Sequence, residues 1–194
     1  MSILRPAYGQ QFPFEIWHAG KTVLDTGDTL RGSLKYDLQS DILQVQINGR
    51  LESFTARKVL YFEIFDSTAK RYRMFYSLPY AATGIYKAPV FFELLAEGEL
   101  TVLCREALEY RTTSSPFYYY GSFTRLVLVN KYFILKPNGN IEEFRGKKND
   151  WYELMRNKQN EVEQFAKSNK LDLDEKYELL RIVEYYNSLF NRVN

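Results

Sequence analysis

The chain has one histidine and one cysteine, the residue types that most often serve as nucleophile, general base or zinc ligand. With His18 alone, no typical zinc site and no Ser-His-Asp or Cys-His triad can be assembled within one chain. We expect His18 to be a surface or strand residue. Strand alternation places Cys104 on the face of Leu100 and Val102, which predicts a buried, inert thiol.

Acidic residues and glycine loops give no catalytic pattern either. Glu142 and Glu143 are adjacent, so a strand would point them to opposite faces, which is wrong for an acid and a base acting on one bond. Gly27 and Gly32 lack the Lys-Ser/Thr pair that follows the glycines of a phosphate-binding loop. The sequence therefore predicts no catalytic residue, no metal ligand and no cofactor. A carboxylate-based hydrolase acting on glycans stays open, because folding can bring two distant acidic side chains together.

Tyrosines near predicted loops are the candidates for binding. Tyr80 and Tyr86 lie in a loop that begins and ends with proline, and Tyr118 and Tyr120 share one face of an extended aromatic run. Exposed tyrosines suit sugar rings, peptides or a protein partner, because each has an apolar ring and a polar hydroxyl. The alternative is burial under the C-terminal helices. We predict these four tyrosines as ligand-binding residues.

Glycine and proline divide the chain into two parts. All 10 glycines and all 6 prolines lie at or before Gly146, which predicts a β-rich body with many turns and then a helical tail. In the tail, Asp150-x-x-Glu153 and Asp172-x-x-Glu175 are typical starts of two amphipathic helices. We expect an α+β fold, with a predominantly antiparallel β body followed by a C-terminal helical hairpin.

Short alternating segments between turn residues predict the strands of the body. Asn48-Gly49 is the strongest hairpin signal and favours a type I′ turn, and Gly32 marks a bulge or bend within a strand. The predicted strands are 21–24, 29–38, 42–47, 50–54, 59–65, 71–77, 90–95, 99–105, 126–129, 131–135 and 141–144.

The order of the first five strands carries a resemblance. The pattern from Gly20-Lys21-x-Val23 through Gly27 to Gly32-x-Leu34 resembles SH3-like or Sm-like small barrels, whose members bind peptides, nucleic acids or each other. The resemblance implies fold more than function. The alternative is a curved meander that continues into the next strands. The predicted organisation is an N-terminal segment (1–19), a small β-barrel (20–66), an antiparallel sheet (67–148) and a helical hairpin packed on the body (149–194).

Two features point to export. Ala7-Tyr8-Gly9 has the small-x-small form of a signal-peptidase site, so residues 1–19 could hold the remnant of a signal peptide, and an ordinary N-terminus is the alternative. Phe91-Phe92-Glu93-x-Leu95-x-x-Gly98 and, later in the chain, Tyr185-Tyr186-Asn187 resemble segments of uncharacterised exported proteins of Bacteroidetes. That resemblance implies a periplasmic or secreted protein and supplies no activity. A cytoplasmic location stays open.

Charge and hydropathy limit the partners. Up to residue 148 there are 19 Lys and Arg against 15 Asp and Glu, and after it 7 against 9, so no concentrated basic field exists and we expect no nucleic-acid partner. No apolar run is long enough for a transmembrane segment. The tail helices cannot bury their apolar faces alone. We expect a non-catalytic exported binding or assembly module for an unknown protein or glycan. The alternatives are the glycan hydrolase and a structural protein that homodimerises through the C-terminal helices.

Overall fold

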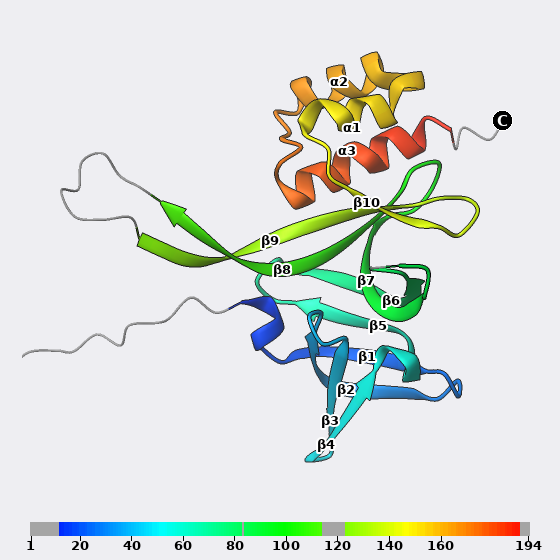
Figure 1. The fold of residues 1–194 in the computed structure, drawn as a ribbon, viewed down its shortest axis with the longest axis vertical. Coiled ribbons are helices and arrows are strands. Elements are labelled where there is room, and N and C mark those ends of the chain that lie inside the picture. Colours follow the sequence, from blue (N-terminus) through cyan, green and yellow to red (C-terminus); the bar gives the residue numbers. More distant parts are fainter. Residues whose placement is uncertain (1–11, 83, 114–122, 191–194) are drawn as a thin grey trace, which may run out of the picture. The chain divides into compact units, whose positions relative to one another are not determined.

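The computed structural model describes residues 12–82, 84–113 and 123–190 (Figure 1). The chain folds into two compact units. Of the described residues, the first unit holds those up to Ser77 together with Pro89–Phe91, and the second holds those within 78–88 and from Phe92 on. The predicted segment ends at residues 66 and 148 therefore fall inside these units.

The first unit is an antiparallel sheet with two short 3-10 turns. Its strands follow the hydrogen-bonded order β6-β5-β1-β2-β3-β4. The elements are η1 (Pro13–Glu15), β1 (His18–Leu24), β2 (Thr29–Asp37), β3 (Ile42–Ile47), β4 (Arg50–Thr55), η2 (Ala56–Lys58), β5 (Val59–Asp66) and β6 (Arg71–Tyr80).

Aromatic rings form the centre of the first unit's core. Phe62 stacks on Phe75 with ring centroids 4.5 Å apart, Tyr36 contacts both rings, and Phe91 meets Phe62 edge-on. The close approach of the strands also needs glycine. Gly20 and Gly32 face each other across β1 and β2, and a Cβ on either would overlap a carbonyl oxygen of the next strand.

The second unit places three helices on a four-stranded antiparallel sheet, in the order β7-β8-β9-β10, within the part of the chain that the structure describes (Figure 1). Its elements are β7 (Ala88–Ala96), β8 (Thr101–Thr113), β9 (Phe123–Leu135), β10 (Ile141–Phe144), α1 (Lys148–Leu154), η3 (Arg156–Lys158), α2 (Gln159–Ser168) and α3 (Lys176–Ser188).

The helices of the second unit bury their apolar faces in one core with the sheet. Trp151 from α1, Val162 from α2 and Ile182 from α3 share this core with Val102 and Cys104 from β8. Burial of such side chains stabilises the fold, because each Å² of apolar surface removed from water contributes roughly 25 cal/mol of free energy. Cys104 is fully buried beside Val102, which confirms the prediction made from strand alternation.

The α+β fold with a predominantly antiparallel sheet and C-terminal helices is confirmed, but several element ends differ from the prediction. The helix expected to run from Asp150 is interrupted at Met155, whose N–H bonds to the carbonyls of Tyr152 and Glu153, and a tighter 3-10 turn follows. The strand expected to end at residue 105 continues to Thr113, because β9 pairs with it along its whole length.

No helix in the described ranges is long and apolar enough to cross a membrane.

Candidate functional site

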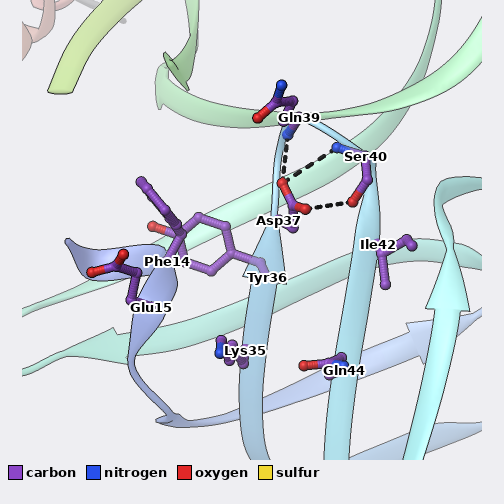
Figure 2. A pocket seen from close by; sticks show the side chains of 9 residues that line it. All are labelled: Phe14, Glu15, Lys35, Tyr36, Asp37, Gln39, Ser40, Ile42 and Gln44. Atoms are coloured by element: carbon purple, nitrogen blue, oxygen red, sulfur yellow. Dashed lines mark hydrogen bonds between the residues drawn. The ribbon is translucent and has the colours of Figure 1, made fainter. Parts of the chain in front are cut away.

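A pocket of about 370 Å³ opens on the first unit between η1, β2 and β3 (Figure 2). Volumes of this size fall within the range of small-molecule sites. Polar side chains, two aromatic rings and one aliphatic side chain form its wall. The residues that line it are Phe14, Glu15, Lys35, Tyr36, Asp37, Gln39, Ser40, Ile42 and Gln44.

The turn between β2 and β3 forms one rim of this pocket and is held by Asp37. Oδ1 of Asp37 accepts hydrogen bonds from the backbone N–H of Gln39 at 2.8 Å and of Ser40 at 3.3 Å, and Oδ2 accepts one from Ser40 Oγ at 2.5 Å. Aspartate favours such turns because its short side chain satisfies the backbone two and three residues on. The Asp37 carboxylate therefore supports the pocket's shape.

The opposite rim is η1, which two side chains hold in place. Glu15 Oε2 accepts a hydrogen bond from the N–H of Phe12 at 2.8 Å. His18, buried on β1, lies with Nε2 2.7 Å from the carbonyl of Pro13 and Nδ1 3.3 Å from the carbonyl of Phe65. The single histidine thus fixes η1 to the sheet. It is a strand residue, as expected, but not a surface one.

Lys35 and Gln44 form the floor of the pocket from neighbouring strands. They are register partners on β2 and β3, and their side chains lie side by side in Figure 2. Neither side chain makes a hydrogen bond or an ion pair with any residue that the structure describes. The ammonium donates only, whereas the amide both donates and accepts. Both groups are therefore available to a ligand.

The pocket can bind a polar ligand that has an apolar face. Lys35 and Gln44 offer donors, Gln44 and the second oxygen of Glu15 offer acceptors, and Phe14 offers a ring, which stacks on Phe12 with centroids 5.5 Å apart. Sites that orient small molecules commonly combine an apolar wall with a few fixed polar groups. No three His, Cys, Asp or Glu side chains among the described residues are placed to hold a metal ion.

The predicted tyrosines lie elsewhere. Tyr80, at the end of β6, packs edge-on between Phe92 and Phe133, with centroids 5.5 Å from each, so its ring supports the second unit's sheet. Tyr86 lies in the β6–β7 connection and is 70 % exposed. Tyr118 and Tyr120 lie outside the described residues. The structure does not bring Tyr80 and Tyr86 to the pocket of Figure 2.

A smaller pocket, of about 320 Å³, lies on the second unit. Three of its four cations have carboxylate partners: Arg145 contacts Glu143 at 2.5 Å, Lys148 contacts Asp172 at 2.7 Å, and Lys131 contacts Glu109 at 3.5 Å. Fewer polar groups are therefore available to a ligand here. The lining residues are Asn130, Lys131, Tyr132, Glu143, Phe144, Arg145, Gly146, Lys147, Lys148, Trp151, Leu173 and Asp174.

Buried charges also gather in the second unit. Lys176 Nζ lies 2.6 Å from Glu93 Oε2 and 3.1 Å from Glu106 Oε1, and all three side chains are buried. Tyr132 has the one buried side-chain polar atom without a hydrogen-bond partner in the described residues, and burial raises its pKa well above the ordinary 10.0. None of the three charged side chains lines a described pocket, so we assign this cluster to stability.

Sequence reasoning missed the pocket because its walls come from segments that only folding joins. One signal was present: Asp37 and Ser40 fall between two predicted strands, where such residues form a turn. To predict that Lys35 and Gln44 are neighbours, one must know the register of β2 and β3. To place Phe14 beside them, one must know that His18 contacts the carbonyl of Pro13.

Comparison of the chain with protein-family models, with curated proteins and with solved structures gives no match.

Proposed function

We propose that the chain is a non-catalytic binding module and that the pocket of Figure 2 binds a glycan. The observation that carries the proposal is the pair Lys35 and Gln44, whose donor and acceptor groups face the pocket without a partner in the described chain, next to the ring of Phe14. Sugars present hydroxyls that both donate and accept, together with an apolar ring face. An amide and an ammonium beside an aromatic ring suit both features.

The charges of the pocket favour a neutral sugar over an anionic one. Lys35 contributes one positive charge, whereas Glu15 and Asp37 contribute two negative charges. An anionic ligand would gain one attraction and meet two repulsions. We therefore expect neutral oligosaccharides to bind better than acidic ones.

Export is part of the proposal and is supported by the sequence alone. It follows from the resemblance to exported bacterial proteins and from the motif Ala7-Tyr8-Gly9. The three residues of this motif lie outside the described residues. Fractionation of cells that express the chain from its natural gene tests it. Recovery in the cytoplasmic fraction alone would contradict export and would leave the pocket proposal intact.

A glycan hydrolase is the second candidate, because Glu15 and Asp37 line one pocket. Asp37 argues against it, since three hydrogen bonds from its own turn occupy both of its oxygens. Glycoside hydrolysis needs one carboxyl that delivers a proton to the leaving group. Analysis of each sugar after incubation with the protein separates the two: released products would establish the hydrolase.

The binding test is a titration of the ¹⁵N-labelled chain with trisaccharides of glucose, of N-acetylglucosamine and of galacturonic acid. We expect amide shifts confined to η1, the β2–β3 turn and the facing parts of those strands, with the acidic trisaccharide the weakest. Gln44→Ala should weaken binding about tenfold, because one hydrogen-bonded side chain in a small site contributes roughly 1.4 kcal/mol.

Gln46→Ala is the matched control. Gln46 lies two residues further along β3, is exposed, and does not line the pocket. It should leave the affinity unchanged. Equal losses in the two variants, or shifts that centre on Tyr86, would contradict the assignment to this pocket.

A further inference from the structure

The outer edge of β8 between residues 107 and 113 is unpaired within the described chain. One side of this segment pairs with β9, from Ala107↔Val129 to Thr113↔Phe123. The other side has no strand beside it, because β7 pairs with β8 only at residues 102–104. In Figure 1 the two strands continue past β7 and β10 as a two-stranded ribbon. Such ribbons are marginally stable in water by themselves.

This edge carries the charged residues Glu109 and Arg111, but it lacks the proline, the lysine and the bulge that most often protect a free strand. Residues 107–113 read Ala-Leu-Glu-Tyr-Arg-Thr-Thr and contain no proline or lysine. Exposed edges normally carry such residues or a bulge, since an unpaired row of N–H and C=O groups recruits another strand. The register with β9 is regular over this stretch, so no bulge blocks the edge. Tyr110, in its middle, is 79 % exposed.

The charges along the edge are complementary to themselves. Two antiparallel copies of β8 with Tyr110 at the two-fold axis would place Glu109 of each copy opposite Arg111 of the other. Opposite charges in directly facing positions stabilise a strand pair. A two-fold interface repeats each such contact, so one register forms two ion pairs.

Arg111 has no carboxylate partner among the described residues of β8 or β9. Its register partner on β9 is Arg125, and like charges in facing positions destabilise a strand pair. No carboxylate among the described residues lies within ion-pair distance of Arg111. Glu109 contacts Lys131 at 3.5 Å, but both side chains are nearly half exposed, so this contact is weak and gives way easily.

Two other free edges, on β9 and β4, fit a second copy less well. The outer edge of β9 at residues 123–131 carries Arg125 and Lys131 and no acidic residue, so antiparallel copies would bring like charges together. On β4, the edge strand of the first unit, Arg50 and Glu52 flank Leu51. A two-fold axis at Leu51 lies beside the Asn48-Gly49 turn, so very few residues could pair.

We propose that two copies of the chain associate through the β8 edge, in antiparallel register about Tyr110, with reciprocal Glu109–Arg111 ion pairs. The association joins two ribbons into a four-stranded sheet. This interface differs from the tail-helix interface expected from the sequence, and it does not depend on the glycan pocket.

Sedimentation equilibrium of the full chain over a concentration series tests the proposal. We expect a species of twice the 23.0 kDa of one chain at high concentration. Arg111→Glu should weaken the association about tenfold or more, because both ion pairs become like-charge contacts. It should not harm the fold, since it also removes the Arg111–Arg125 repulsion. Glu109→Arg should weaken association similarly, and the double swap Glu109→Arg/Arg111→Glu should restore it.

Arg181→Glu is the control, because it makes the same change at an exposed position of α3. It should leave the association constant unchanged, and circular dichroism verifies that each variant keeps its fold. A wild-type chain that is monomeric at every concentration would overturn the proposal. So would a dimer that survives Arg111→Glu, a double swap without rescue, or a dimer that only Arg181→Glu dissociates.

Discussion

The side-chain amide of Asn187 pairs with both backbone groups of Leu100. Its Oδ1 accepts the N–H of Leu100 at 2.8 Å, and its Nδ2 donates to the carbonyl of Leu100 at 3.0 Å and to that of Glu97 at 3.2 Å. Asn187 is buried near the end of α3. It therefore takes the place of a strand neighbour for the β7–β8 turn and fixes the helix to that turn.

Asn187→Leu should destabilise the fold by about 1–3 kcal/mol, because it leaves the N–H and the carbonyl of Leu100 buried without their partner. Urea unfolding monitored by circular dichroism measures the change. Asn160→Leu, at an exposed position on α2, is the control and should change stability by less than about 0.5 kcal/mol. Equal effects of the two substitutions would show that the Leu100 contacts contribute nothing.

Local sequence patterns predicted where strands, turns and helices lie better than they predicted which strands pair with one another. The Asn48-Gly49 turn has φ of 49° and 78°, as the predicted type I′ turn requires. Glycine and proline marked the body, and apolar spacing marked the helices, since both signals act within a few residues. The length of β8 was missed because its last eight residues are held by β9 and not by their own alternation.

The sequence did not predict which polar residues are buried. Each of them bonds to a group from another segment of the chain. Arg73 lies on the predicted strand 71–77, where the sequence carries no sign that it is buried, yet it is 3 % exposed and bonds to Asp66 and Tyr36. His18 is buried because two carbonyls from other segments face its ring. The candidate site was missed for the same reason. A single sequence gives no register, and register decides which polar groups meet.

Lys176→Met should destabilise the fold by about 3–5 kcal/mol, because it leaves the buried carboxylates of Glu93 and Glu106 without a counter-charge. Thermal and urea unfolding at neutral pH measure the loss. The control, Lys167→Met, removes an exposed pair with Glu163 on α2 and should cost only about 0.3–0.5 kcal/mol. Adding Glu93→Gln to Lys176→Met should recover part of the loss. If the two lysine variants have equal stability, the buried contacts have no net value.

The pH dependence of stability should include a contribution from Asp66. Burial alone would raise the pKa of Asp66, but hydrogen bonds from the N–H groups of Ala69 and Thr68 and contact with Arg73 hold it below the ordinary 3.8. A lowered folded pKa means that the ionised carboxylate stabilises the fold above the unfolded value. That stabilisation is lost as the pH falls below about 4 through the folded pKa.

Asp66→Asn tests this contribution, because it removes the carboxylate charge that faces the buried Arg73. At neutral pH we expect a loss of about 3–5 kcal/mol. The gap between wild type and variant should narrow as the pH is lowered through the acid range in urea titrations. Asp25→Asn, which breaks the exposed pair with Lys58, is the control and should cost about 1 kcal/mol or less. A gap that stays constant down to the most acidic pH would refute the assignment.

The thiol of Cys104 should react only when the second unit opens. Its side chain is fully buried, with Sγ 3.7 Å from Oδ1 of Asn130, so a reagent has no access to it in the folded chain. We expect labelling by Ellman's reagent to be slow in buffer and to accelerate in urea in parallel with unfolding. Ser67→Cys supplies an internal standard, because residue 67 is exposed in the β5–β6 turn. In that variant one thiol should react at once and the second at the wild-type rate. Immediate reaction of both thiols in buffer would mean that the core around Cys104 admits the reagent, and the packing of α1 to α3 on β8 would then be looser than described.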